Sequence, residues 1–189
     1  MRLRDENKRK LIVQTAVKLF SEQPFHKVRL DDVAEAAGVG KGTVYIYFKN
    51  KEELYYSLVY EGLADSVERL RGRIQQPGLS FADKMHAAAE ELVEYGVRYP
   101  QFFDVLRTVG IPDAGSLWDA KRREYCDLVE GFIRQGNSDG DCDDSHPEWT
   151  AVYVASNVRA AMLYGPKTAN PKELADHIAK GLLRGIAKK

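Results

Sequence analysis

A short segment near the N-terminus, residues 41–47, carries side chains suited to contact with a polyanion. Its sequence, KGTVYIY, places a cation at Lys41, a hydroxyl at Thr43 and two phenols at Tyr45 and Tyr47. A lysine can reach a guanine edge or a phosphate, a threonine offers a methyl group and a hydroxyl, and a tyrosine hydroxyl can bind a phosphate oxygen. Gly42 lets the backbone approach closely. We therefore expect this segment to contact DNA.

Two short helices must position these side chains. Val44 and Phe48 form an i, i+4 apolar pair that predicts the inward face of the second helix. The turn before it is Ala37-Gly38-Val39, where Gly38 suits a positive φ. The preceding helix has its own apolar face, made of Leu30, Val33, Ala34 and Ala37. This arrangement predicts a helix-turn-helix. Tyr45 and Tyr47 would point to different sides of the second helix, so both cannot belong to its inward face.

Three flanking residues extend the predicted contact surface. Arg29 precedes the first short helix and could bind a phosphate. Gly40 precedes the second helix as its expected N-cap, where glycine is only slightly worse than serine. Lys51 starts a further helix and adds a cation beside a helix N-terminus, and both attract phosphate.

The rest of the chain is also helical in pattern. A first helix runs to Pro24, and the sequence NKEE, starting at Asn50, opens a long helix through about Arg73. Further helices are expected at about 80–98, 115–135 and 146–164, and a last one begins with Pro171 after Asn170. The fold class is therefore all-α. We expect an N-terminal three-helix domain over 1–50 with the helix-turn-helix, and a C-terminal helical domain over 51–189.

Charge and composition narrow the class of protein. The chain has 189 residues, 44% apolar and 30% charged, with a net charge of zero. Residues 1–50 hold 10 Lys and Arg against 6 Asp and Glu, and the remainder holds 18 against 22. A basic N-terminal part on an acidic body fits a protein that places one end on a polyanion. Two cysteines, and the lack of a long apolar run, predict a reduced cytoplasmic protein without a membrane anchor.

The stretch VAEAAGVGKGTVYIYFKNKEELY resembles the DNA-binding signature of the TetR family of bacterial repressors, with a dense match from about Leu11 to Tyr55. The resemblance implies a homodimer that binds double-stranded operator DNA and a small-molecule effector, without a cofactor. It places six residues at DNA-contact positions: Lys41, Gly42, Thr43, Tyr45, Tyr47 and Lys51. The chain departs from the family pattern at Val28-Arg29 and at Gly40, where a hydroxyl residue is usual. These departures leave the detailed contacts open.

The aromatic-rich region after residue 75 is expected to hold the effector, because pockets between helices are largely apolar with a few polar groups. Most of its aromatic residues should be ordinary core. The candidates for the pocket are Phe102, Phe103, Trp118, Tyr125, Tyr153 and Asn157. The last two helices have faces suited to docking, and the family pattern implies a four-helix dimer contact there. Its expected residues are Trp149, Ser156, Leu174, Ile178 and Leu182.

Other functions have weaker support in the sequence. Acidic residues between Asn137 and Glu148 have a spacing similar to a calcium loop, but Cys142 occupies the position that requires glycine. We expect no metal. An enzyme would need a nucleophile and a base, and the sequence holds no motif that assembles them. A purely architectural DNA-binding protein would not need so large an aromatic-rich region after the helix-turn-helix. The sequence thus favours a ligand-responsive regulator, most simply a repressor released from a palindromic operator by a small apolar or amphipathic molecule.

Overall fold

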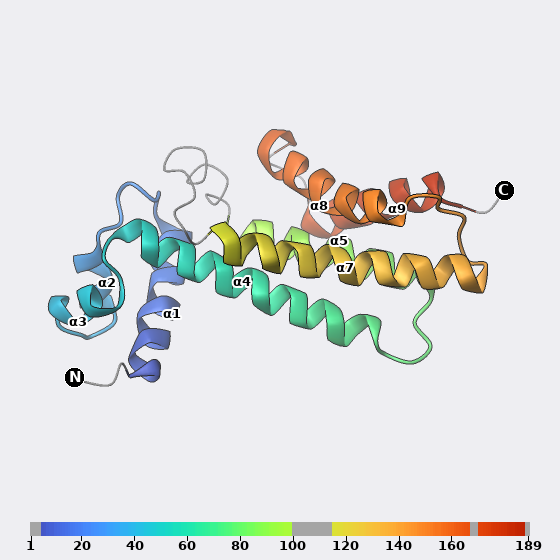
Figure 1. Cartoon of the computed structure of the whole chain (residues 1–189). Coiled ribbons are helices and arrows are strands. Elements are labelled where there is room, and N and C mark those ends of the chain that lie inside the picture. Colours follow the sequence, from blue (N-terminus) through green and yellow to red (C-terminus); the bar gives the residue numbers. More distant parts are fainter. Residues whose placement is uncertain (1–4, 100–114, 167–169, 188–189) are drawn as a thin grey trace. The chain divides into compact units, whose positions relative to one another are not determined.

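The computed structural model describes residues 5–99, 115–166 and 170–187, and within these ranges it contains eight α-helices and no strand (Figure 1). Their bounds are α1 Glu6–Glu22, α2 Leu30–Ala36, α3 Lys41–Tyr47, α4 Lys51–Ile74, α5 Phe81–Arg98, α7 Gly115–Asp139, α8 Pro147–Tyr164 and α9 Pro171–Gly185. The predicted all-α class is confirmed.

The chain divides into two compact units. Among the described residues, the first unit contains 5–62 and Tyr99, and we call it the head. The second contains 63–98, 115–166 and 170–187, and we call it the body. The division falls inside α4, whereas the sequence suggested a boundary after residue 50. The boundary after residue 50 remains a prediction. The start of α4 packs with the head, and the rest of this helix belongs to the body.

The head is built around the buried face of α1. That face consists of Ile12, Val13, Ala16 and Phe20. The Phe20 ring meets the edge of Tyr55 at a centroid distance of 4.9 Å and stacks on Phe25 at 5.6 Å, so α1, the segment after it and the start of α4 share one aromatic cluster. α2 packs against α1 and α3. The predicted pair Val44 and Phe48 is buried in this core, at 0% and 2% exposure.

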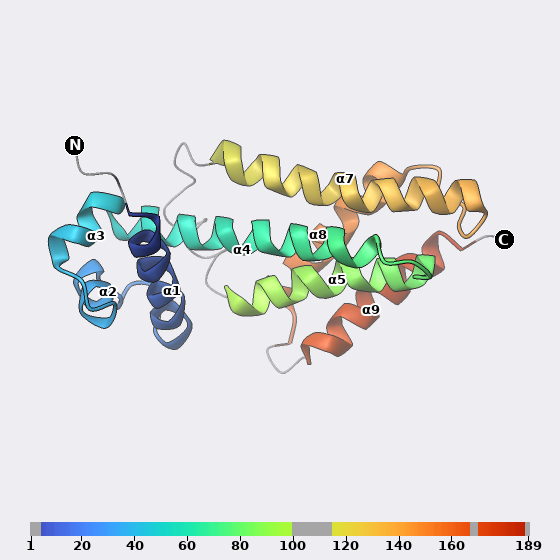
Figure 2. The ribbon, with the colours of Figure 1, turned by 90° about the horizontal axis from the view of Figure 1, so that it is seen from below.

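The body is organised around α5, which contacts α7, α8 and α9. Figure 2 shows α9 alongside α5. Its buried positions are Met85, Ala87, Ala88, Ala89, Glu91, Leu92, Val93, Tyr95 and Gly96. The run of alanines keeps this helix thin and allows its neighbours to approach closely. α8 lies against both α7 and α5, and α9 against α5 and α8.

Helix termini follow the predicted caps in two places and differ in two others. Asn50 Oδ1 accepts the Glu53 N–H at 2.7 Å, and Asn170 Oδ1 accepts the Lys172 N–H at 2.9 Å. The helix expected at 146–164 begins one residue later, because His146 is its N-cap and Pro147 is its first residue. The predicted end of α7 near 135 is wrong, because the helix continues through Asp139 and shortens the polar loop that follows.

Candidate nucleic-acid interface

The turn between α2 and α3 has the geometry that the sequence predicts. Gly38 has a φ of 65°, in the left-handed region that favours glycine. The Val39 N–H donates to the carbonyl of Ala34 at 3.0 Å, so the chain reverses immediately after α2. Gly40 is the N-cap of α3, and its carbonyl accepts the Thr43 N–H at 2.8 Å. These contacts fix where α3 begins.

The outward side of α3 presents two large side chains. Tyr45 is 53% exposed and Ile46 is 57% exposed, while Val44, on the inward side of α3, is fully buried. Gly42 is also exposed and Thr43 is partly exposed. Ile46 was missed from the sequence, although its position opposite Val44 and Phe48 on a helical wheel could have identified it. An exposed apolar side chain on such a helix can contact the methyl group of thymine.

Lys41 lies at the start of α3 and pairs with an acidic residue of α2. Its Nζ donates to Asp31 Oδ2 at 2.7 Å, and its side chain is 69% exposed. The hydrogen bond to Asp31 raises the pKa of Lys41. The lysine is therefore charged and at the surface, and a nucleic acid would compete with Asp31 for it.

Tyr47, the last residue of α3, is tied to the main chain of Asp5. Its hydroxyl accepts the Asp5 N–H at 2.9 Å and donates to the Asp5 carbonyl at 3.0 Å. Asp5 is the N-cap of α1, and its carboxylate accepts the N–H of Asn7 at 3.0 Å. The predicted DNA contact thus also holds two helices of the head together.

The remaining predicted contacts flank α3. Lys51 Nζ donates to the Phe25 carbonyl at 3.0 Å and lies 4.5 Å from the centroid of the Phe25 ring. Arg29 is exposed before α2, and its backbone N–H donates to Asp32 Oδ2 at 2.8 Å. Asp32 thus satisfies the N–H of the N-cap residue, whereas the arginine side chain has no acceptor for a first-turn N–H. All eight predicted DNA contacts lie in or directly beside the helix-turn-helix of the head.

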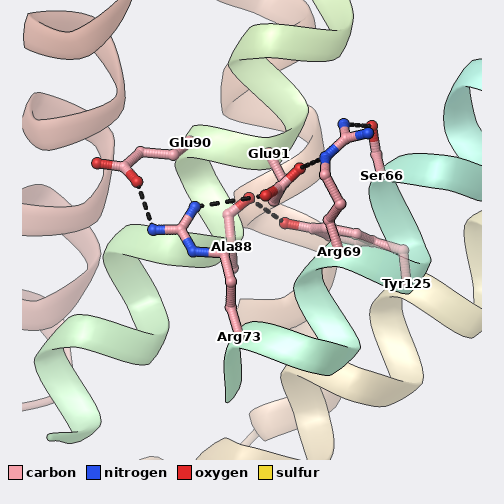
Figure 3. Close-up of polar contacts among 7 residues, drawn as sticks. All are labelled: Ser66, Arg69, Arg73, Ala88, Glu90, Glu91 and Tyr125. Carbon is pink, nitrogen blue, oxygen red and sulfur yellow. Dashed lines mark hydrogen bonds and ion pairs between the residues drawn. The ribbon is translucent and has the colours of Figure 1, made fainter. Parts of the chain in front are cut away.

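The body holds its own polar cluster, between α4, α5 and α7 (Figure 3). Glu91 of α5 is 3% exposed, and its two carboxylate oxygens accept from Arg69 Nε at 2.8 Å and from Arg73 Nη1 at 3.4 Å. Arg73 also pairs with Glu90 at 2.6 Å. A buried carboxylate requires such partners, because an unpaired charge in this environment is costly.

Further contacts extend this cluster toward α7. The Tyr125 hydroxyl donates to the Ala88 carbonyl at 2.8 Å, one turn before Glu91 on α5. Arg71, on another side of α4, pairs with Glu124. A hydrogen bond from Lys121 holds the pKa of Glu124 below its usual value. Three arginines therefore attach the last turns of α4 to two different helices of the body.

The predicted effector residues occupy different environments. Tyr125 is buried and Trp118 is half-buried, whereas Tyr153 and Asn157 are exposed on α8. Phe102 and Phe103 lie outside the described residues. Tyr153 and Asn157 share the outward side of α8 with Trp149 and Ser156, two residues predicted for the dimer contact.

The predicted dimer residues also divide. On α8, Trp149 is 56% exposed and Ser156 is exposed. On α9, Leu174 and Leu182 are half-buried, and Ile178 is only 8% exposed because α9 packs against α5. The exposed side of α8 also carries Val152 and Tyr164, which were not among the predicted site residues, and the effector candidate Tyr153.

The acidic segment after α7 is organised by hydrogen bonds. Asn137 Oδ1 accepts the Asp144 N–H at 2.9 Å, and Asn137 Nδ2 donates to the Asp144 carbonyl at 2.8 Å. Within the described ranges, no three His, Cys, Asp or Glu side chains are grouped so as to hold a metal ion. The same ranges contain no helix with the length and hydropathy needed to cross a membrane.

The fold and this surface define a class of protein, a helical regulator with an N-terminal helix-turn-helix. Residues 12–58 match the family model described as bacterial regulatory proteins of the tetR family. An uncharacterized HTH-type transcriptional regulator of Bacillus subtilis, YhgD, is 27% identical over 180 residues, which cover 94% of this chain and 93% of that protein.

Solved structures extend the likeness to the whole fold. A regulator of the TetR/AcrR family from Thermobifida fusca has a TM-score of 0.79 at 23% identity, over 95% of this chain and 98% of its own. FadR of Bacillus subtilis, solved in complex with stearoyl-CoA, has a TM-score of 0.73 at 18% identity, over 94% and 98%. The chain belongs to the TetR family of bacterial transcriptional regulators.

Proposed function

We propose that this regulator is a repressor that binds a palindromic operator as a homodimer and is released by a small apolar or amphipathic molecule. The observation that carries the proposal is the outward side of α3, where Tyr45 and Ile46 are more than half exposed and Lys41 is charged. A short helix that exposes these side chains can enter a major groove, which admits one α-helix.

The side chains take different roles on DNA. Lys41 and Thr43 are the proposed readers of base edges, and Ile46 adds an apolar contact for a thymine methyl. Tyr45 and Lys51 are proposed phosphate contacts, together with Arg29. Phosphate contacts fix the position of the protein without reading sequence. This division predicts which substitutions change specificity and which weaken binding to every duplex.

A second copy of the chain is the proposed partner of the outward side of α8. Trp149, Val152 and Tyr153 are 41–56% exposed there, and Tyr164 is 85% exposed. Aromatic residues are enriched in the buried cores of interfaces. α9 would contribute Leu182 and Leu174 at the edge of this contact. Ile178 supports the contact indirectly, since its side chain is occupied within its own subunit.

The effector would bind within the body. The likeness to a regulator solved with stearoyl-CoA makes a long-chain acyl-CoA the first amphipathic probe to test. If an effector weakens DNA binding tenfold, linkage requires that DNA weaken effector binding tenfold, about 1.4 kcal/mol in either direction. Calorimetry with and without operator DNA measures this reciprocity.

Selection from a random duplex pool tests the DNA-binding proposal. We expect enrichment of a pseudo-palindrome whose half-sites lie about 34 Å apart or a multiple of that distance. Addition of the acyl-CoA probe, or of other amphipathic molecules, should then release the selected duplex. Failure to enrich any sequence would contradict a specific repressor.

Light scattering tests the dimer. The double substitution Trp149→Ser and Tyr153→Ser should give monomers, because these side chains are exposed in one subunit and their loss leaves its core intact. Leu11→Ser is the matched control, since Leu11 is an exposed apolar residue of α1 at 44% exposure. A dimer that survives the α8 substitutions would place the interface elsewhere.

A further inference from the structure

The hydrogen bonds of the Tyr47 hydroxyl leave it no proton for DNA. A phenol has one O–H donor and two acceptor lone pairs. The Asp5 carbonyl can only accept, so the Tyr47 hydroxyl donates its proton to it at 3.0 Å. The Asp5 N–H can only donate, so the Tyr47 oxygen accepts it at 2.9 Å. A phosphate oxygen at neutral pH is an acceptor. Tyr47 could bind one only by giving up its bond to Asp5.

The residue that Tyr47 holds is itself fixed. The Asp5 carboxylate accepts the N–H groups of Asn7 at 3.0 Å and Lys8 at 3.4 Å, and the Asp5 carbonyl also accepts the Arg9 N–H at 3.1 Å. Asp5 is therefore held in place as the N-cap of the first turn of α1. A bond to its main chain joins α3 to a complete helix.

A second contact joins the same two parts of the head. Phe48 is the residue directly after α3, and the Arg9 guanidinium lies 5.6 Å from the centroid of its ring. Arg9 also pairs with Glu61 of α4 at 2.5 Å. The start of α1 thus touches the last residue of α3 through the Tyr47 hydroxyl, and the C-cap residue of α3 through the Phe48 ring.

The recognition helix needs such support because it is short. α3 has seven residues, and a helix of this length is marginal without tertiary contacts. Val44 and Phe48 hold its inward side in the core, but apolar packing alone permits rotation about the helix axis. The two directional bonds of Tyr47 restrict that rotation at the C-terminal end of α3.

We propose that Tyr47 is a positioning residue, which orients the outward side of α3 through Asp5, and is not a phosphate contact. The inference rests on the proposed function, because it assigns to Tyr47 a part in how α3 meets DNA. It separates two tyrosines that the sequence pattern treats alike: Tyr45 is free to face a phosphate, and Tyr47 determines where Tyr45, Lys41 and Ile46 point.

Hydrogen exchange on the free protein tests the tie between the helices. Tyr47→Phe keeps the ring and removes only the hydroxyl, so the Asp5 amide should exchange about fivefold faster, the factor that corresponds to one ordinary hydrogen bond. Tyr45→Phe is the matched control and should leave that amide unchanged. Unchanged exchange in Tyr47→Phe would overturn the inference whatever the DNA measurements give.

Binding to the selected operator and to a random duplex tests the consequence. Loss of a phosphate contact weakens both duplexes equally, whereas misorientation of α3 weakens the operator more. We expect Tyr47→Phe to lower the operator-to-random affinity ratio about fivefold, in line with the same hydrogen bond. Tyr45→Phe should leave that ratio unchanged while it weakens both.

The two possible failures differ in their results. If the wild-type chain binds no duplex selectively, the proposed function fails, and the exchange measurement still reports on the tie. If the wild type binds its operator and Tyr47→Phe loses the same factor on both duplexes, DNA binding stands and the positioning role is wrong.

Discussion

The contacts that hold the two ends of the helix-turn-helix in the head differ from those of the buried Glu91 cluster in the body. In the head, Tyr47 bonds to the main chain of Asp5 and Lys51 to the carbonyl of Phe25. In the body, Arg69 and Arg73 bond to the side chain of Glu91. A contact to the main chain survives most substitutions of the partner residue, whereas a contact between two side chains needs both. A single substitution of a partner residue should therefore disturb the Glu91 cluster more than the main-chain contacts of Tyr47 and Lys51.

Glu91→Ala should give the largest effect on stability. It removes the carboxylate that Arg69 and Arg73 share, and breaking a buried ion pair typically costs 3–5 kcal/mol. Both arginine side chains are about 40% exposed and can gain water, so we expect a smaller loss, about 2–3 kcal/mol, by urea denaturation.

The exposed residue Glu94 provides the control for this prediction, because it lies on the same helix, three residues away. Glu94→Ala should leave the urea midpoint unchanged. If the two variants were equally stable, the cluster in Figure 3 would contribute nothing net, and the proposed contrast with the head would fail.

Two glycines of the head provide a sharper pair. Gly38 has a φ of 65°, where alanine is strained, so Gly38→Ala should cost about 1 kcal/mol after allowance for its effect on the unfolded chain. A methyl group meets no atom within 4 Å at either Gly38 or Gly42. Gly42 is inside α3, where alanine favours the helix, so Gly42→Ala should stabilise by about 0.5–1 kcal/mol. Thermal denaturation of both variants checks the opposite signs, and equal signs would contradict the turn geometry.

The fold of the head could be predicted because its signals are local. Gly38, the Val44 and Phe48 pair and the Asn50 cap act over one to four residues, and each has the predicted role in the structure. The body follows only in outline. The end of α7 was missed because Asn137, Ser138 and Asp139 have weak helix propensity, and tertiary contacts outweigh such a weak preference.

Tyr125 offers a test of the body that depends on pH. Burial raises the pKa of its phenol well above the usual value, and its hydroxyl donates to Ala88. Near pH 7, Tyr125→Phe should cost about 1 kcal/mol, the net value of one hydrogen bond. A raised pKa means that this stability is present below the unfolded pKa of about 10 and is lost as pH rises toward the folded pKa.

The stability difference between wild type and Tyr125→Phe should therefore close with rising pH. The loss is about 1.4 kcal/mol per pH unit above the unfolded pKa, so the two proteins should be about equally stable near pH 11. Paired denaturation curves at neutral and alkaline pH isolate this residue, because the other tyrosines are common to both proteins. A constant difference would mean that the phenol titrates normally in the folded body.

The candidate site could be predicted as a set of residues but not as a set of contacts. The sequence pattern placed Tyr45 and Tyr47 on different sides of α3, yet it could not show that the partner of Tyr47 would be Asp5, 42 residues earlier. Glu91 was missed altogether, because one glutamate in a helix of mixed charge has no local sign of burial. Its partners, Arg69 and Arg73, lie about twenty residues away on α4.

Lys51→Ala and Lys41→Ala should give the smallest effects on folding and the finest comparison within the head. Lys51 is held against the Phe25 carbonyl and ring at the start of α4, and under the proposed function its charge would lie near a phosphate. Its loss should lower the slope of log affinity against log salt by about one and weaken all duplexes equally.

Lys41 must leave Asp31 to reach a base edge, so Lys41→Ala should instead reduce the preference for the operator. Titrations of operator and random duplex at several salt concentrations measure both quantities. Asp31→Asn serves as the matched control, because it frees Lys41 and should tighten binding. If Lys51→Ala left the affinity and the salt slope unchanged, its contacts with Phe25 would be its only role, and the proposed phosphate contact at the start of α4 would be wrong.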